Sequence, residues 1–189
     1  TIQALIIQQD AKTARYYLAK FSRLMRQILE NSRESLISLD DEIQTLENYL
    51  SIEKFSAGKP FHYELNIDEN LETEDILIPP MVIQPFVENA IIHGVAHLSS
   101  KGSVEVNFFQ NKEWIECSIV DNGIGREKAM QKKSQLAQQH KSTALVVTQE
   151  RLDILYESDT SIKSLEIIDL RNEKGDALGT KVIVRLPIT

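Results

Sequence analysis

The sequence predicts an α+β protein, in which a helical hairpin precedes one β-sheet that carries helices over one of its faces. Residues 1–57 contain neither glycine nor proline and repeat their apolar residues at helical spacing. From Phe61 onward, short segments with alternating apolar residues are interspersed with helical patterns in the order β-α-β-β-α-β-β. We therefore expect two domains, at residues 1–58 and 59–189.

The composition is that of a packed, acidic protein. Apolar residues make up 42% of the 189 positions and the net charge is −7, so we expect a core and exclude non-specific nucleic-acid binding, which needs a basic patch. No apolar run approaches the ~20 residues that span a bilayer. The single Cys117 cannot form an internal disulfide, which favours a reducing, cytoplasmic setting. Because Thr1-Ile2-Gln3 is an unusual start, we expect a fragment whose parent protein could carry a membrane region upstream.

The first domain is predicted to be a helical hairpin connected by residues 32–38. Apolar residues recur in steps of four and three along two segments, first at Ala14, Leu18, Phe21, Met25 and Ile28, then at Leu39, Ile43, Leu46 and Leu50. Ser38 followed by Asp41 fits a cap at the start of the second helix. An isolated hairpin of this size buries its stripes poorly, so we expect a homodimer with a four-helix bundle through residues 11–57. The alternative is packing against the rest of the same chain.

The second domain is predicted to contain one sheet. Strands are expected around residues 61–67, 104–108, 115–119, 165–170 and 182–186, the second and third forming a hairpin. Helices are expected at 80–95, after Pro79-Pro80, and at 144–156. Residues 126–141 are polar and rich in Lys and Gln, so we expect a mobile lid or loop there.

The predicted helix around residues 83–94 combines a core face with polar side chains. Its apolar face is formed by Ile83, Phe86, Val87, Ala90 and Ile91, and the opposite face by Glu88, Asn89 and His93. An asparagine carbonyl is a hard oxygen ligand for a metal bound to phosphates, and a nearby glutamate can assist proton transfer or orient a nucleophile. The alternative is a row of solvated polar residues. Zinc is disfavoured because the two histidines at i and i+4 that zinc motifs use are absent.

Three further segments could complete a nucleotide pocket. One segment, Asp121-Asn122-Gly123-Ile124-Gly125, follows a predicted strand. Its Asp can accept a hydrogen bond from the exocyclic amine of adenine, and its glycines allow a ligand to approach the backbone closely. The alternative is an ordinary turn. Gly179-Thr180 could meet the nucleotide or simply bend into the last strand. Ser142 or Thr143 can cap the next helix, whose N-terminus could bind phosphate, while Arg151 could support phosphate charge or face solvent.

Other nucleotide-binding and hydrolytic classes lack their signatures in this sequence. There is no GxxxxGK[ST] phosphate-binding loop, which excludes a P-loop NTPase. No GxGxxG follows a strand within a βαβ unit, and no nucleophile elbow with a Ser/His/Asp order is present.

In their order and spacing, these segments closely resemble the LytS-type sensor histidine kinases of bacterial two-component systems. The resemblance is carried by Pro-Pro-Met-Val-Ile-Gln-Pro-Phe-Val-Glu-Asn-Ala-Ile-Ile-His-Gly at 79–94, Asp-Asn-Gly-Ile-Gly at 121–125, Glu-Arg-Leu at 150–152 and Gly-Thr at 179–180. Residues 17–26 and 47–53 look like the same family's dimerisation helices. The resemblance implies the GHKL (Bergerat-type) ATP-binding fold, a two-layer α/β sandwich with a mixed sheet, for residues 59–189.

The resemblance also implies roles for the matching residues. Asn89 would hold Mg2+ against the ATP phosphates, with Glu88 beside it as the other catalytic residue, and His93 would border the phosphate end of the pocket. Asp121 would recognise adenine. The other residues expected to bind the nucleotide are Gly123, Gly125, Ser142, Arg151, Gly179 and Thr180.

The implied activity is that of a protein histidine kinase, a transferase that passes the γ-phosphoryl group of ATP to a histidine and then to an aspartate of a response regulator. The family's His-Phe-x-Phe-Asn segment, which carries the acceptor histidine, is absent from this chain. We therefore expect the fragment to bind ATP and ADP without phosphorylating itself. The resemblance further implies that the parent protein is a bacterial inner-membrane sensor, with this chain as its cytoplasmic part.

Two alternatives stay open. Ala144 stands where the family usually has a lid glycine; if that position needs a positive φ, ATP affinity suffers, and the chain could be a degenerate, non-catalytic nucleotide-binding or scaffold module. If the position is helical, alanine is harmless. The other alternative is a hydrolytic GHKL ATPase in which Glu88 activates water, and the kinase-like helices weigh against it.

Overall fold

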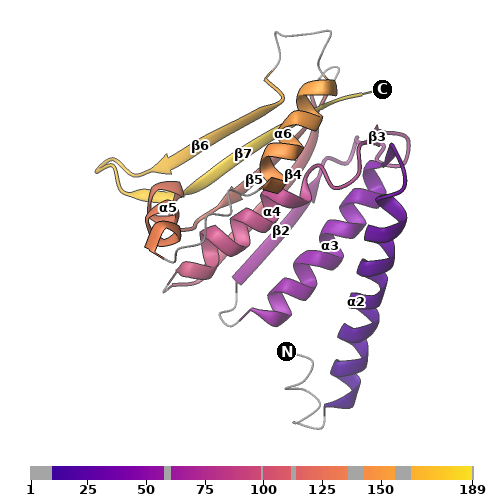
Figure 1. Cartoon of the computed structure of the whole chain (residues 1–189), viewed down its shortest axis with the longest axis horizontal. Coiled ribbons are helices and arrows are strands. Elements are labelled where there is room, and N and C mark those ends of the chain that lie inside the picture. Colours follow the sequence, from indigo (N-terminus) through magenta and orange to yellow (C-terminus); the bar gives the residue numbers. More distant parts are fainter. Residues whose placement is uncertain are drawn as a thin grey trace. The chain divides into compact units, whose positions relative to one another are not determined.

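The computed structural model of the chain describes residues 10–57, 61–98, 100–111, 114–135, 143–155 and 163–188. The chain divides into two compact units, Thr1–Pro60 with Thr73–Met81, and Phe61–Glu72 with Val82–Thr189. Figure 1 shows the first unit mainly as two long helices and the second as a sheet with shorter helices. The first unit therefore includes a segment from beyond residue 58, and the assignment of residues 1–58 and 59–189 to dimerisation and ATP binding stays a prediction.

The first unit is built on the predicted helical hairpin. Helix α2 (Ala11–Asn31) begins where the Asp10 side chain accepts a hydrogen bond from the backbone of Thr13, and α3 (Leu39–Ser56) begins at the expected cap, Ser38, which accepts from the backbone of Asp41. The two helices contact each other through stacked rings of Tyr17 and Phe55, whose centroids lie 3.6 Å apart.

A two-stranded ribbon and a buried glutamate complete this unit. Strand β1 (Ile37–Ser38) pairs antiparallel with β3 (Leu77–Ile78), a pairing that the sequence did not suggest. Glu42 on α3 is only 1% exposed, and its Oε2 accepts a hydrogen bond of 2.9 Å from the backbone of Met81, whose φ is +57°. Met81 is thereby held in a left-handed conformation, which non-glycine residues rarely adopt, immediately before the second unit begins.

The two predicted apolar stripes have different environments. On α3, Leu39, Leu46 and Leu50 are completely buried, as expected. On α2, Ala14 is buried, but the buried position in the C-terminal half of the helix is Leu24 rather than a member of the predicted stripe. Tyr17 and the stripe member Ile28 are half-buried. Five large apolar side chains of α2 are exposed, namely Tyr16 at 54%, Leu18 at 52%, Phe21 at 46%, Met25 at 41% and Leu29 at 57%.

The second unit contains one mixed five-stranded sheet with the strand order β2-β4-β5-β7-β6. Its strands are β2 (Phe61–Ile67), β4 (Gly102–Asn111), β5 (Trp114–Asp121), β6 (Leu165–Arg171) and β7 (Ala177–Pro187). Strands β2 and β4 are parallel, and all other neighbours are antiparallel, with β4 and β5 forming the predicted hairpin. All five strands that the sequence predicted are therefore present.

Helices cover one face of this sheet (Figure 1). They are α4 (Gln84–Asn89), which continues as a π-helical turn η1 (Ala90–Gly94) and a 3-10 turn η2 (Val95–His97), then α5 (Arg126–Gln135) and α6 (Thr143–Leu155). The apolar residues of β4 and β5 that face them, such as Val106, Phe108 and Cys117, are completely or almost completely buried. In the ranges described, no helix combines the length and the apolar character needed to cross a bilayer.

Two details of the helix predictions were wrong. The helix expected from residue 80 begins at Gln84, so Pro85 in its first turn is the proline that suits a helix start, rather than Pro79-Pro80. The expected lid or loop at 126–141 is helical over Arg126–Gln135, and residues 136–141 lie outside the described part. The second error arose because this helix has almost no apolar face; its residues are good helix formers, and ion pairs described below fix its first turn.

Candidate functional site

The alternation of strand β5 places Asp121 on the covered face of the sheet. Ile115, Cys117 and Ile119 point toward the helices and are at most 1% exposed. Because strand side chains alternate with a period of two, position 121 falls on the same face. Asp121 is accordingly only 6% exposed, and it lies opposite Thr180 of β7 in the antiparallel register.

Burial changes the acidity of Asp121. Desolvation raises the pKa of its carboxyl group from 3.8 to about 6, and hydrogen bonds from the backbones of Gly123 and Thr180 offset part of that rise. The Gly123 N–H donates to Oδ1 over 2.8 Å. Among the described residues no ion pair with a cation accompanies the two backbone donors, so the buried carboxylate is poorly compensated. Such an environment is typical of a group kept for a ligand rather than for stability.

Glycines allow the main chain to approach this carboxylate closely. A Cβ added at Gly94 would lie 2.8 Å from Asp121 Oδ1, and one added at Gly123 would lie 2.4 Å from the Gly94 backbone. Gly179 has a φ of +134°, and its added Cβ would meet the Asp121 carbonyl oxygen at 1.8 Å. Any side chain at these three positions would push the helix, the loop or strand β7 away from Asp121.

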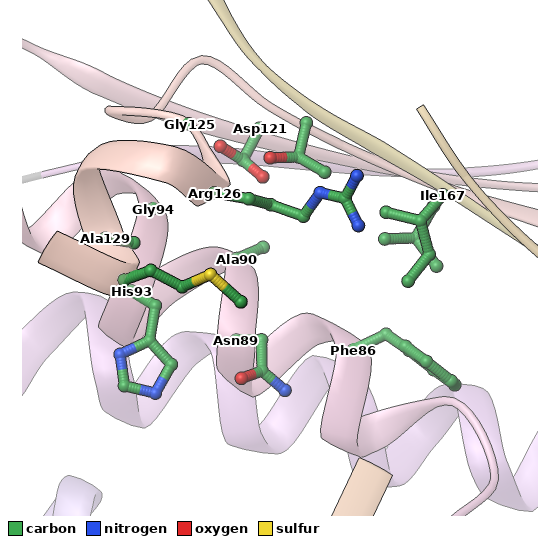
Figure 2. A pocket seen from close by; sticks show the side chains of 13 residues that line it. Phe86, Asn89, Ala90, His93, Gly94, Asp121, Gly125, Arg126, Ala129 and Ile167 are labelled. Atoms are coloured by element: carbon green, nitrogen blue, oxygen red, sulfur yellow. The ribbon is translucent and has the colours of Figure 1, made fainter. Parts of the chain in front are cut away.

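Helix α4 and its π-helical continuation present Asn89 and His93 to the same region. Phe86 and Val87 are buried and anchor the helix, while Asn89 and His93, four residues apart, lie one above the other. The Asn89 side-chain nitrogen donates to the Pro85 carbonyl, an interaction that orients the amide. The side-chain oxygen of Asn89 then lies on the side nearer His93, as Figure 2 shows.

A cavity of about 220 Å3 brings these residues together (Figure 2). Five predicted nucleotide-binding residues line it, namely Asn89, His93, Asp121, Gly125 and Thr180. The rest of its lining is mostly apolar and includes Phe86, Ala90, Ala129, Met130, Ile167 and Val182. An apolar chamber with a buried acid and an amide suits a flat heterocycle that carries an amine and is attached to a polar group.

The other predicted residues lie outside the lining of this cavity. Gly123 and Gly179 contact Asp121 and shape its surroundings. Glu88 points elsewhere on α4, where its Oε1 accepts a hydrogen bond of 2.8 Å from Gln84. Arg151 is half-buried on α6, and Ser142 lies outside the described residues.

Sequence reasoning missed two contributions to the site. Gly94 ends the π-helical turn and touches Asp121, and the signal for it was a glycine directly after the helical polar pair. Helix α5 supplies Arg126, Ala129 and Met130 to the cavity wall, although its polar sequence suggested a loop. Gly125, with a φ of +78°, turns the chain from β5 into α5.

The first turn of α5 is tied to strand β6. Arg126 forms a bidentate ion pair with Asp169, with Nε at 2.7 Å from Oδ1 and Nη2 at 2.9 Å from Oδ2. This pair lowers the pKa of Asp169 because the guanidinium stabilises the ionised carboxylate. Arg171 pairs with Glu127 at 2.6 Å.

The residues around Asn89 are compatible with Mg2+ but cannot form a metal cage alone. Among the described residues, no group of three or more His, Cys, Asp and Glu side chains is placed to hold a metal. Mg2+ commonly takes one or two protein oxygens, with water and substrate phosphates completing an octahedron. Asn89 could supply one such oxygen, so the donor set fits a metal that arrives with a nucleotide.

Comparison with known proteins relates both units to kinases. The family model for histidine kinases matches residues 1–61. "Sensor protein LytS" of Oceanobacillus iheyensis is 34% identical over 125 residues, which cover 66% of this chain and 21% of that protein. "Sensor protein LytS" of Staphylococcus saprophyticus is 31% identical over 191 residues, covering 99% of this chain and 30% of that protein. The chain thus spans less than a third of the length of these curated relatives.

Solved structures of histidine kinases share the fold of this chain. The histidine kinase domain of the Erythrobacter litoralis EL346 blue-light activated histidine kinase matches 97% of this chain and 83% of its own, with a TM-score of 0.53 and 14% identity. The mycobacterial sensor histidine kinase MprB matches 81% of this chain and 96% of its own, with a TM-score of 0.52 and 12% identity. The α+β fold with N-terminal helices and a mixed sheet, expected from the sequence, is therefore confirmed.

Proposed function

Because this chain belongs to the LytS-type sensor histidine kinases, we propose that it is the ATP-binding and dimerisation core of a two-component kinase. The observation that carries this proposal is that Asp121 and Asn89, from elements distant in sequence, line one cavity. The buried carboxylate of Asp121 suits the adenine end of Mg·ATP, and the side-chain oxygen of Asn89 suits the end that carries Mg2+ and the phosphates.

Asp121 would bind the base. Its carboxylate has an accepting oxygen for the 6-amino group of adenine, and the apolar walls formed by Ala90, Ile167 and Val182 would contact the ring. The carboxylate of Asp121 is already largely desolvated by burial, so the binding of a purine adds little further desolvation cost.

Asn89 would orient the phosphates through Mg2+. The metal, when bound, neutralises phosphate charge, which is most of what phosphoryl transfer requires besides alignment. His93, one turn further, would border the same phosphates. The resemblance implies further anion binding by Ser142, which lies outside the described residues, and by Arg151, and the start of α6 at Thr143 could add free backbone N–H groups.

Glu88 would act on the incoming acceptor histidine rather than on the nucleotide. Glu88 directly precedes Asn89 in the chain but does not line the cavity, and its Oε1 accepts a hydrogen bond from Gln84. Its carboxylate would orient the imidazole of a histidine that approaches from outside the cavity. We propose that the phosphoryl group passes from an acceptor histidine to the aspartate of a response regulator.

The exposed apolar side chains of α2 support a homodimer through residues 11–57. Leu18, Phe21, Met25 and Leu29 lie on one side of the helix and are all more than 40% exposed. A second copy of the hairpin would cover them and form a four-helix bundle. We further propose that the parent protein is a bacterial inner-membrane sensor and that this part lies in the cytoplasm, where ATP is available.

The degenerate-scaffold alternative has lost its main support. Ala144 is the second residue of α6, so its backbone is helical and alanine adopts it without strain.

Calorimetric titration with ATP and ADP, with and without Mg2+, tests the proposal. We expect the wild-type chain to bind ATP more tightly with Mg2+, Asp121→Asn to lose most affinity, and Asp68→Asn, which removes a charge outside the cavity, to bind normally. Absence of binding by the wild-type chain would instead support a scaffold, and ATP turnover without a histidine donor would support a hydrolytic ATPase.

The transfer step needs the longer protein. A chain extended upstream through the acceptor histidine should become labelled by γ-labelled ATP, with a phosphate that acid releases and base does not. Labelling that persists after substitution of that histidine would refute the assignment.

A further inference from the structure

Arg126 separates two cavities in the second unit. It lines the 220 Å3 cavity together with Asp121, and it also lines a neighbouring cavity of about 140 Å3 between α5 and the β6–β7 turn. In Figure 2 its side chain extends past Asp121 toward Ile167, so that the guanidinium forms part of the wall.

The electrostatic surroundings of Arg126 disfavour an anion. Both Nε and Nη2 are already used by Asp169, and Asp121 is a further carboxyl group in the lining of the 220 Å3 cavity. In the smaller cavity Lys128 and Arg171 are balanced by Glu127, Asp169 and Asp176, and Arg171 is paired with Glu127. A phosphate would have to displace Asp169 from both donors of Arg126 or lie beside the Asp121 carboxylate, and either arrangement costs free energy. A neutral aromatic ring meets no such repulsion.

The bidentate pair also fixes the plane of the guanidinium. A carboxylate that accepts two parallel hydrogen bonds from a guanidinium fixes the orientation of the guanidinium plane. The face of that plane remains able to stack on a planar ring. The cavity beside it carries apolar side chains such as Ile167 and Val182, as expected for a surface that receives a base.

We propose that Arg126, held flat by Asp169, is the wall on which the nucleotide base stacks, and that it sets affinity through the base rather than through the phosphates. Asp169 is then a positioning residue that acts through Arg126. This inference rests on the proposed function, because it assumes that a nucleotide base enters the cavity.

The prediction is a loss of affinity that does not depend on phosphate number. Arg126→Ala should weaken ADP and ATP equally, roughly tenfold, in the range for stacking and cation–π contacts. Arg126→Lys keeps the charge but loses the flat fork, and Asp169→Asn frees the guanidinium, so each should weaken both nucleotides by a smaller and again equal factor. Competition by inorganic tripolyphosphate should not change in any variant.

Glu127→Gln is the matched control. It breaks the neighbouring ion pair between the same helix and the same strand, but Glu127 does not line the larger cavity. Titrations of all variants, with urea unfolding to verify folding, should show normal affinity for Glu127→Gln. Equal losses in Glu127→Gln and Arg126→Ala, or a loss larger for ATP than for ADP and relieved by salt, would overturn the inference.

The outcome separates this inference from the proposed function. If the wild-type chain binds ATP and Asp121→Asn does not, the proposed function stands whatever the Arg126 variants do. Normal ADP and ATP affinity in Arg126→Ala would then overturn only the stacking wall, whereas absence of nucleotide binding by the wild-type chain would overturn both.

Discussion

Replacing Asp121 by asparagine should stabilise the protein at neutral pH while abolishing nucleotide binding. The raised pKa of Asp121, about 6 against 3.8, means that folding penalises the ionised carboxyl. Well below pH 3.8 the group is protonated in the folded and unfolded states, so there is no penalty, and at pH 4 the penalty is still small. As the pH rises through 6 the folded state bears the full cost.

The change in the free energy of unfolding can be calculated from the rise in the pKa of Asp121. Two pKa units correspond to about 3 kcal/mol, because each unit is worth about 1.4 kcal/mol. The wild-type free energy of unfolding should therefore fall by about 2 kcal/mol relative to that of Asp121→Asn between pH 4 and pH 7.5. At pH 7.5 the net gain is smaller, about 1–2 kcal/mol, since asparagine offers one accepting oxygen to two backbone donors.

Urea unfolding followed by circular dichroism at pH 4 and pH 7.5 measures this difference. Comparison with the variant cancels the contributions of other carboxyl groups, such as Asp169, whose pKa is lowered and which act in the opposite direction. If Asp121→Asn is less stable than the wild type at pH 7.5, or if the difference does not change with pH, then the carboxylate is a structural group and the reasoning about the site is wrong.

Three further predictions concern Gly179 in the second unit and the two helices of the first unit. Gly179→Ala should destabilise the protein by about 3 kcal/mol or more, seen as a lower thermal midpoint, because the Cβ would overlap the Asp121 backbone at a positive φ; a normal midpoint would contradict the close approach. Ser38→Ala should cost about 1 kcal/mol in urea unfolding through loss of the α3 cap, whereas Ser22→Ala, on the exposed surface of α2, should cost much less. Phe21→Glu with Met25→Glu should convert a sedimenting dimer into a monomer, whereas Lys12→Glu should not; an unchanged dimer would show that the exposed stripe is not the interface.

Much of the fold could be predicted because its signals are local. The strands of the second unit alternate visibly, and the apolar stripe of α3 matches its buried residues. The stripe of α2 was identified by spacing alone, and spacing does not tell which side faces α3. The stacking of Tyr17 on Phe55 marks the side of α2 that contacts α3, and neither Tyr17 nor the buried Leu24 belongs to the predicted stripe.

The site was partly predictable for a similar reason. Period-two alternation and a glycine-rich turn pointed to Asp121, and helical spacing pointed to Asn89 and His93. Arg126 could not be found in this way, because its role depends on Asp169, forty-three residues later and on another strand. Long-range ion pairs leave no periodic pattern in a sequence.

The strands β1 and β3 could not be predicted from the sequence because they are too short to show an alternating pattern. Each has two residues, and their pairing joins Ile37 and Ser38, directly before α3, to Leu77 and Ile78. The left-handed Met81 beside them carries no sequence mark either, since methionine has no preference for positive φ.

The most direct test of a nucleotide site between Asp121 and Asn89 is a crystal structure of the chain soaked with Mn2+ and a non-hydrolysable ATP analogue. The anomalous signal should place one metal within coordination distance of the Asn89 side-chain oxygen, with the adenine amine on Asp121 in the same cavity. A metal and nucleotide bound elsewhere, or an empty cavity at saturating ligand, would contradict the account.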